Sequence, residues 1–279
     1  MSAQTYTGPR RRGVGVALTT VTWLLALAFF FPVLWLAMTA FKQENQASSS
    51  PPTWVFTPTL DQFRAVIEGG SAVYVGNSAI ATGVSTLLVL LLGIPASYAL
   101  SIRPVKRVSD VLFFFISTKM LPVVAVIVPI YVIAGQLRVL DNIWTLVVLY
   151  TAMNLPIAVW MMRSFFQEIP VEVLEAASMD GAGLMRTLRS VLLPMVAPGI
   201  AATALICVIF AWNEFFFALN LTASRAATVP LFITSTMTSE GLFLARLSAA
   251  AILASLPVIL AGWIAQKQLV RGLSMGAIK

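Results

Sequence analysis

An acidic stretch near the middle of the chain holds four of its eleven acidic residues. Glu168, Glu172 and Glu175 recur at spacings of four and three residues, and Asp180 follows them. In an α-helix these spacings place the three glutamates on one face. Such a face can accept charge-assisted hydrogen bonds from an arginine or from backbone N–H groups of a partner. The stretch therefore predicts a docking surface, with a solvated interfacial helix that has no partner as the alternative.

The residues around the glutamates predict two short helices. Pro170 suits the first position of a helix, where its missing N–H costs nothing, and Gly181 and Gly183 supply a stop. We therefore expect a helix over residues 171–179, in which Leu174 and Ala177 form a second, apolar face that allows close approach by a partner. A further helix is predicted over residues 184–193, which carries two arginines and ends at a proline.

Several kinds of chemistry are excluded by composition. The chain contains no histidine, which removes histidine metal sites, Ser-His triads and imidazole proton relays. Its single cysteine, Cys207, cannot form an internal disulfide. No Gly-x-x-x-x-Gly-Lys-Ser/Thr phosphate loop is present, so ATP would have to be hydrolysed by another protein. We expect no catalytic residue, no metal ligand and no cofactor on this chain, and we find no cluster of ionisable residues that a membrane-embedded enzyme would need.

The bulk composition is typical of a membrane protein. Hydrophobic residues make up 59% of the 279 residues and charged residues 10%, against roughly 25% charged residues in soluble domains. A helix that crosses the bilayer needs about 20 mostly apolar residues. Six stretches qualify, at residues 14–41, 73–102, 111–135, 143–162, 195–221 and 247–264. The fold class is therefore an all-α membrane protein with six transmembrane helices, and the many prolines within them predict a bent bundle around a cavity.

The first stretch also has features of a signal peptide. Arg10, Arg11 and Arg12 form a positive region, and residues 26–28 (Ala-Leu-Ala) fit a cleavage site. The sequence stays apolar through residue 40, where a mature secreted chain would turn polar. We interpret the stretch as an uncleaved membrane anchor.

The distribution of Lys and Arg predicts the orientation. With the N-terminus in the cytoplasm, twelve basic residues lie inside: Arg10, Arg11, Arg12, Arg103, Lys106, Arg107, Arg163, Arg186, Arg189, Lys267, Arg271 and Lys279. Five lie outside: Lys42, Arg64, Arg138, Arg225 and Arg246. The excess of positive charge inside predicts that both termini are cytoplasmic, and it places the acidic stretch there too. Because the basic residues flank apolar runs, they do not indicate nucleic-acid binding.

The acidic stretch also carries a spaced motif that runs from Glu175 to Pro194. It reads Glu175-Ala176-Ala177, three residues, Gly181, nine residues, Val191, one residue and Leu193-Pro194. This motif resembles the signature loop of the membrane subunits of bacterial ATP-driven (ABC) importers, with Val191 where isoleucine is usual. The resemblance implies that the loop is a coupling helix between spans 4 and 5 that docks on a separate ATPase. The residues that it assigns to ATPase coupling are Glu175, Ala176, Ala177, Asp180, Gly181, Leu193 and Pro194.

The resemblance extends to the maltose-type carbohydrate permeases. Trp212-Asn213-Glu214-Phe215, residues 155–160 (Leu-Pro-Ile-Ala-Val-Trp) before Arg163, and the C-terminal segment from Gln266 to Lys279 are similar to segments of their smaller permease subunit. Residues 117–122, 220–224 and 241–248 look most like the mannitol/sorbitol (polyol) branch. The implied organisation is a cytoplasmic N-terminal tail (1–13) and one transmembrane domain (14–279), with a coupling loop (164–194) and a C-terminal cytoplasmic tail (265–279).

The resemblance implies the partners. In that family a periplasmic or extracellular solute-binding protein delivers a sugar or polyol, a second homologous permease completes a heterodimer, and two ATPase subunits hold ATP-Mg. The chain would thus be a multi-pass protein of the bacterial inner membrane. In the smaller permease of this kind, the outer loop between the last two spans contacts the binding protein, and the corresponding region is 222–246.

Polar side chains within the apolar stretches are candidates for the solute path, because polar groups are costly in the bilayer. Asn154 could bind a solute hydroxyl or satisfy a carbonyl freed by Pro156. Asn213 and Glu214 could bind hydroxyls or bond to a neighbouring helix, and Lys119 could pair with Glu214, line a cavity or extend towards the membrane surface. Tyr150 could stack on a sugar ring, as could Trp160, Trp212 and Phe216, although ordinary packing is the simpler interpretation of all four aromatic residues.

A second function from another class is an ion-coupled secondary transporter of small polar solutes. It would use Lys119 and Glu214 as a coupled pair, and it would take up solute without an ATPase. The lack of histidine and the ATPase-docking motif both weigh against it.

Overall fold

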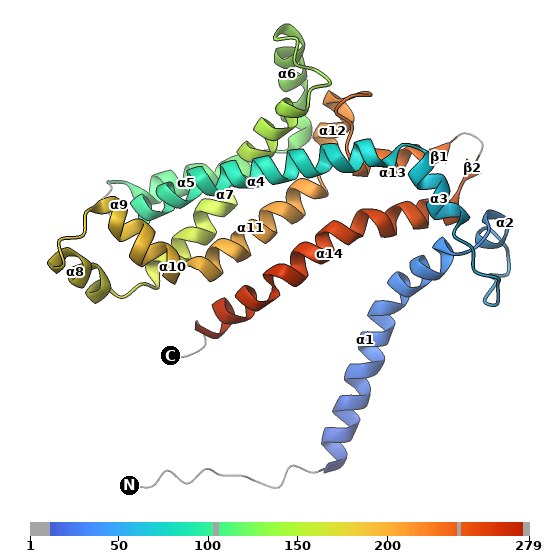
Figure 1. The fold of residues 1–279 in the computed structure, drawn as a ribbon, viewed down its shortest axis with the longest axis horizontal. Coiled ribbons are helices and arrows are strands. Elements are labelled where there is room, and N and C mark those ends of the chain that lie inside the picture. Colours follow the sequence, from blue (N-terminus) through green and yellow to red (C-terminus); the bar gives the residue numbers. More distant parts are fainter. Residues whose placement is uncertain (1–11, 103–105, 239–240, 276–279) are drawn as a thin grey trace. The chain divides into compact units, whose positions relative to one another are not determined.

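A computed structural model describes residues 12–102, 106–238 and 241–275. Most of the predicted N-terminal tail (1–13) and the last four residues of the predicted C-terminal tail lie outside the described residues. The regular structure of the described residues is helical, apart from a ladder of two short strands, β1 (Met237–Thr238) and β2 (Gly241–Leu242) (Figure 1). The helices are α1 (Arg12–Ala40), α2 (Glu44–Ala47), α3 (Asp61–Glu68), α4 (Ser71–Ile102), α5 (Val108–Met120), α6 (Val123–Gln136), α7 (Ile143–Gln167), α8 (Val171–Met179), α9 (Leu184–Arg186), a π-helix (Thr187–Leu192), α10 (Leu193–Met195), α11 (Ala197–Trp212), α12 (Phe216–Leu221), α13 (Val229–Ser235) and α14 (Leu244–Met275).

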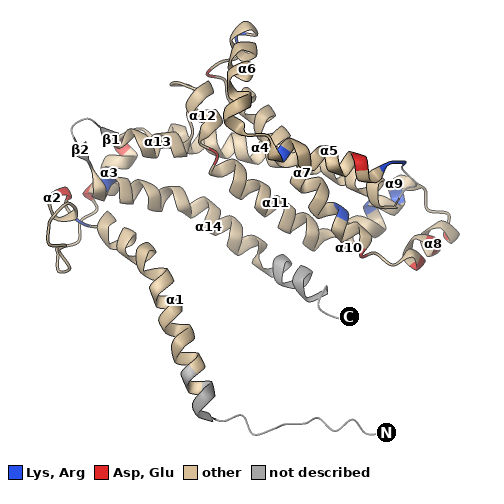
Figure 2. Cartoon of the chain, turned by 180° about the vertical axis from the view of Figure 1, so that it is seen from behind, with Lys and Arg blue, Asp and Glu red and all other residues tan. Residues whose placement is uncertain are grey.

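The predicted all-α fold with membrane-spanning helices is confirmed in its helical content and its apolar spans. Four described helices, α1, α4, α7 and α14, are long and apolar enough to cross a membrane. Two further spans arise if each of two bent helix pairs counts as one, which gives up to six. Figure 2 shows that α4 and α11 carry neither acidic nor basic residues along their length, whereas both kinds occur around α8 and α9.

Two predicted spans are interrupted. The stretch predicted at 111–135 is divided into α5 and α6, which meet at an angle of 88° around Leu121 and Pro122. Pro122 lacks the N–H that would continue the α5 hydrogen-bond ladder, which explains the break at this position. The stretch predicted at 195–221 is likewise divided, because α11 ends at Trp212 and α12 begins at Phe216. Continuous apolar composition therefore did not mean continuous helix.

The described chain forms two compact units, of which the larger comprises Ile67–Met237 and Leu253–Lys279. In this unit α4, α7 and α11 pack side by side (Figure 1). The contact surfaces carry small residues: Gly93 of α4 lies against Ala158 of α7, and Val89, Ala158 and Cys207 form one buried cluster. Helices in a bilayer gain little from hydrophobicity alone, so they associate through such close packing. Trp212 of α11 also donates from its indole Nε1 to the Ala254 carbonyl of α14, at 3.0 Å.

The smaller unit comprises Met1–Val66 and Thr238–Ile252. Glu44 of α2 accepts hydrogen bonds from the backbone N–H groups of Ala245 and Arg246 at the start of α14 (3.0 and 3.3 Å). A carboxylate at a helix N-terminus satisfies free N–H groups and interacts favourably with the helix dipole. Lys42 is buried, with its ammonium 2.7 Å from the Thr53 carbonyl and 4.4 Å from the ring centre of Trp35. Lys42 therefore contributes to packing in this unit.

Candidate functional site

The helix predicted over residues 171–179 is present as α8, with those bounds. It ends in a Schellman motif, in which Gly181 N–H donates to the Ser178 carbonyl and Ala182 N–H to the Ala177 carbonyl (3.1 and 3.0 Å). Gly181 has φ +69°, a left-handed conformation that disfavours residues with a Cβ atom. Its predicted role as the helix stop is therefore confirmed. Pro170 immediately precedes α8, in extended conformation.

The two faces of α8 differ in exposure. Glu172, Glu175 and Ala176 are exposed, and Met179 is 88% exposed. Ala177 is only 6% exposed, so it is not available as the apolar surface for a partner that its spacing suggested. Any partner of α8 must therefore contact the face that carries Glu172, Glu175, Ala176 and Met179.

The buried face of α8 packs on a cluster that joins α4, α7 and the segment before α11. Tyr98, Met162, Phe166, Leu192 and Val196 form its buried part, and Leu174 packs against it. Tyr98 and Phe166 meet edge to face, with ring centres 6.0 Å apart. Leu174 is therefore packed inside the chain, and it does not form part of the apolar docking face that the sequence predicted. The cluster ties α8 to the ends of the long helices.

The segment that follows α8 is helical as predicted, but it is not regular. The structure has α9, a π-helix over Thr187–Leu192 and α10 where residues 184–193 were predicted to form one helix. Pro194 cannot donate to the carbonyl four residues earlier, Ser190, which lies within the π-helical turns. The segment Leu184–Met195 then meets α11 at 75°. Leu193 lies half-buried against the cluster, and Pro194 is exposed at the bend.

The start of α11 approaches α7 very closely. A Cβ atom at Gly199 would overlap the ring of Phe165. The φ angle of Gly199 is not in the left-handed region. Glycine is therefore required here because of the close packing and not because of the backbone conformation. Nearby, Arg163 of α7 donates from Nε to the Leu100 carbonyl of α4 (3.3 Å), and Ser101 Oγ donates to the Arg163 carbonyl (3.3 Å). These contacts fix the end of α7 from which α8 continues.

Asn154 lies at the packing surface of α4, α7 and α11, one turn from Ala158. It is fully buried, and neither its amide nitrogen nor its amide oxygen has a hydrogen-bond partner. A carbonyl freed by Pro156 is therefore not its partner. An unpartnered buried amide costs about 1–3 kcal/mol. To reach a solute, Asn154 would need α4, α7 and α11 to separate.

The predicted pairing of Lys119 with Glu214 is not found. Lys119 Nζ donates to the Met153 carbonyl at 2.8 Å, and it lies 5.8 Å from the ring centre of Phe210. Met153 is three residues before Pro156, whereas the carbonyl that Pro156 leaves without its helical donor is that of Ala152. Lys119 therefore bonds to the backbone of α7 close to the proline.

Glu214, Asn213 and Tyr150 also have partners within the chain. The Glu214 carboxylate accepts from the N–H groups of Phe217 and Ala218 (2.9 and 3.4 Å), and so caps α12. Asn213 Nδ2 donates to the Ile209 carbonyl at 2.8 Å, and the same carbonyl accepts from the Asn213 backbone N–H at 3.2 Å. Tyr150 is buried in a hydrophobic cluster to which α12 contributes Phe217, Ala218 and Leu221. These three residues hold the turn between α11 and α12.

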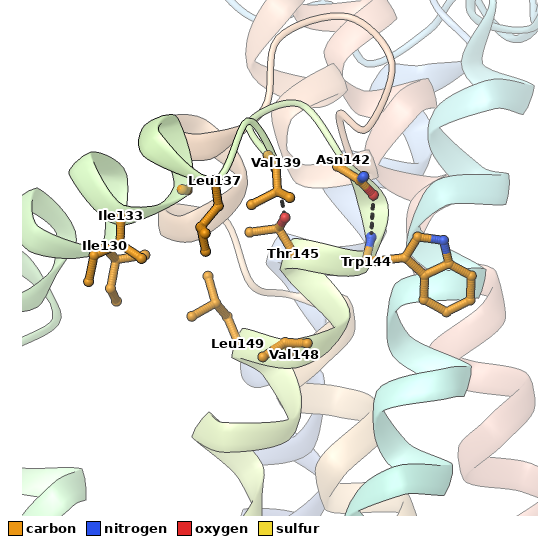
Figure 3. Close-up of a pocket in the computed structure, with 10 residues that line it drawn as sticks. Ile130, Ile133, Leu137, Val139, Asn142, Trp144, Thr145, Val148 and Leu149 are labelled. Carbon is orange, nitrogen blue, oxygen red and sulfur yellow. Dashed lines mark hydrogen bonds between the residues drawn. The ribbon is translucent and has the colours of Figure 1, made fainter.

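A pocket of about 410 Å³ lies between α6 and α7 (Figure 3). Ile130, Ile133, Leu137, Val148 and Leu149 supply its apolar walls. Among the few polar groups there, Asn142 Oδ1 accepts from Trp144 N–H and Thr145 Oγ1 donates to the Val139 carbonyl. A carbohydrate needs several hydrogen-bonding groups in its site, so this pocket is not suited to one, and the predicted path residues do not line it.

Asp141, just before α7, makes the densest set of side-chain hydrogen bonds described in the chain, and it was not among the residues predicted from the sequence. Its carboxylate accepts from the backbone N–H groups of four successive residues, Ala223 to Ala226, at 2.9–3.2 Å. Burial alone would raise the pKa of Asp141, but these four donors outweigh it and hold the pKa well below its usual range. Its own N–H donates to the Leu221 carbonyl. The sequence signals only a helix start here.

Gly199→Ala should destabilise the protein by about 1–3 kcal/mol, because the new methyl group forces the Phe165 ring from its position. The measurement is the thermal unfolding of the purified protein. Gly183→Ala is the matched control, since a Cβ atom at Gly183 would meet nothing within 4 Å. Equal unfolding temperatures for the two variants would contradict the close contact.

Asp141→Asn should lower stability by about 1–2 kcal/mol near neutral pH, after allowance for solvent screening of a half-exposed group. Because the folded-state pKa is depressed, this contribution is present above the unfolded pKa of about 3.9 and is lost as the pH falls through the folded value. The difference in unfolding temperature between wild type and variant should therefore shrink below about pH 4. A difference that stays constant from pH 7 to pH 3 would argue against the carboxylate as its source.

Comparisons with known proteins agree with this architecture. Residues 89–275 match the family described as binding-protein-dependent transport system inner membrane component. A probable ABC transporter permease of Sinorhizobium fredii is 39% identical over 94% of this chain and 95% of its own length. The trehalose/maltose transport system permease MalG of Thermococcus litoralis is 30% identical over 92% of this chain and 94% of its own.

A solved structure shows the same fold. A bacterial ABC transporter involved in the import of the acidic polysaccharide alginate contains a chain that matches with a TM-score of 0.76. The match covers 95% of this chain and 99% of that one, at 20% identity. The chain therefore belongs to the family of binding-protein-dependent transport system inner membrane components, and it is the multi-pass permease subunit of an ABC importer rather than its ATPase.

Proposed function

We propose that this permease carries a sugar or sugar alcohol across the bacterial inner membrane, powered by separate ATPase subunits that hold ATP-Mg. Residues 14–279 act as one transmembrane domain with six spans, and both termini are cytoplasmic. The coupling loop is 164–194. The observation that carries the proposal is α8, a short capped helix that directly follows α7 and exposes an acidic face.

The proposed mechanism couples α8 to the spans by contact and by covalent connection. Glu175 and Glu172 accept hydrogen bonds from cationic or N–H groups in a cleft of the ATPase. Leu174, Ala177 and the cluster around Phe166 transfer a displacement of α8 to α4, α7 and α11. Gly181 ends the helix so that the segment up to Pro194 can return to the membrane. A second homologous permease completes the path, and a solute-binding protein delivers the solute.

The nature of the solute is supported by relatives. One relative is named for trehalose and maltose transport, and a Streptomyces coelicolor relative, 30% identical over 92% of this chain, is named for diacetylchitobiose uptake. A polyol is the narrower proposal, and it rests on short segments such as residues 220–224. In the structure the N–H groups of Ala223 and Ser224 bond to Asp141, and the Asn220 side chain bonds to the Phe216 carbonyl. Its likeness to polyol permeases therefore says more about loop structure than about the solute.

The solute path within this subunit is proposed to pass Asn154. It is the predicted path residue whose polar atoms are left unpartnered, and separation of α4, α7 and α11 in another state would expose it. Lys119, Glu214, Asn213 and Tyr150 are proposed to shape the path through their bonds to the backbone or their packing. Because Lys119 and Glu214 are not paired, the structure offers no support for an ion-coupled pair.

Glu175→Lys should lower ATP-driven uptake about ten- to a hundredfold, since one charge-assisted bond contributes about 1.5–3 kcal/mol to docking. The complete transporter would be reconstituted in proteoliposomes and supplied with labelled maltose, trehalose and mannitol. Glu68→Lys, an exposed glutamate of α3, is the control for the charge change.

Two results would contradict the proposal. One is uptake by the Glu175→Lys transporter equal to that of the control. The other is uptake by the isolated chain driven by a proton or sodium gradient without ATPase subunits. The variant must also be shown in the membrane at the wild-type level, so that failed insertion is not counted as lost coupling.

A further inference from the structure

Three side chains hold one segment of the chain, residues 221–229, which begins the outer loop of the proposed topology. Asp141 binds the N–H groups of Ala223 to Ala226. Asn77 Nδ2 donates to the carbonyls of Arg225 and Ala227 at 2.8 and 2.9 Å. Ser78 Oγ accepts from the N–H of Val229, the first residue of α13, at 2.9 Å. We call these three side chains and the segment they hold the outer clasp.

The clasp joins parts of the chain that are far apart in the sequence. Asn77 and Ser78 belong to α4, whereas Asp141 lies two residues before α7. The ring of Phe232 in α13 packs on Tyr74 of α4, with centres 4.8 Å apart. The outer loop is therefore attached at its start to two spans, and residues 222–229 are not a free arm.

The position of Asp141 relative to α7 gives the clasp a mechanical meaning. Helix α7 has 25 residues, which corresponds to a length of about 37 Å. At its far end Gln167 is followed, after three residues, by α8. One helix thus connects the proposed ATPase-docking element directly to the residue that holds the outer loop.

We propose that Asp141 is a positioning residue for transport, which fixes the outer loop to α7 so that a displacement of α8 reaches the outer face. This inference rests on the proposed function, because it takes α8 as the element that the ATPase moves. Asp141 contacts neither solute nor nucleotide, and it acts through the backbone of residues 223–226. Ala223, Ser224 and Arg225 are exposed and can contact the binding protein, although Ser224 Oγ also donates to Asp141 at 3.4 Å.

The test is Asp141→Asn in the complete transporter with its binding protein. Asparagine has nearly the same shape, but its Nδ2 group would face N–H donors instead of accepting from them. The readout is the coupling ratio, the amount of labelled maltose, trehalose and mannitol taken up per ATP hydrolysed. We expect it to fall about fivefold or more, while ATP hydrolysis without binding protein stays unchanged. Asp61→Asn, an exposed aspartate of α3, should leave both unchanged.

A spectroscopic readout separates positioning from general destabilisation. A nitroxide on Ala223→Cys reports loop mobility, and the native Cys207 is fully buried and so is shielded from labelling. The label should be immobile in the wild-type background and mobile with Asp141→Asn. If Asp141→Asn does not accumulate, Asn77→Ala removes two bonds to the same segment and should shift mobility and coupling ratio in the same direction.

The outcomes are distinct. An unchanged coupling ratio in both variants, in a transporter whose wild type takes up solute, would overturn this inference alone. A label that stays immobile while the coupling ratio falls would also overturn it, because the loss would then not arise from the loop. Absence of ATP-driven uptake in the wild type would overturn the proposed function and this inference together.

Discussion

Close contact between α4, α7 and α11 is the constraint on which the rest of this structure depends. Small side chains such as Gly93, Ala158 and Cys207 let the helix backbones approach one another, and Gly199 does the same against Phe165. In a bilayer the lipid tails are as apolar as the side chains, so dispersion in such contacts must supply the association. Both the α8 segment and the outer clasp are attached to the ends of these three helices.

The same apolar surroundings require that backbone groups find partners inside the protein. Several residues that looked like solute ligands meet this need instead. Lys119 donates to the Met153 carbonyl, Glu214 caps α12, and Asn213 donates to the Ile209 carbonyl near the end of α11. Asn154 is the exception among the path candidates, because its polar atoms are buried without partners. Polar residues in these spans therefore separate into those that bond to the backbone and Asn154, whose amide atoms have no partner in this structure.

Local sequence signals predicted local structure well. The bounds of α8 and the stop at Gly181 followed from Pro170 and the two glycines, since cap and turn chemistry is read within a few residues. The existence of long apolar helices followed from composition. The prolines predicted bent helices, and the bend at Pro122 agrees with this. The division at residues 213–215 was not predicted, because apolar composition is the same in a straight and a broken helix. The burial of Leu174 and Ala177 was missed because helical spacing defines a face without showing what covers it.

Local sequence signals could not predict contacts between residues that are far apart in the chain. Asp141 and the backbone donors that it binds are 82 to 85 positions apart, and neither segment carries a sequence signal for contact with the other. The contact also has a consequence for sequence variation. Apart from a hydrogen bond from Ser224 Oγ, it is made to peptide N–H groups, which every amino acid except proline provides. The exposed side chains at 223 and 225 can thus diversify to suit a new binding protein without loosening the attachment, whereas Ala226 is buried and proline at any of the four sites would remove a donor.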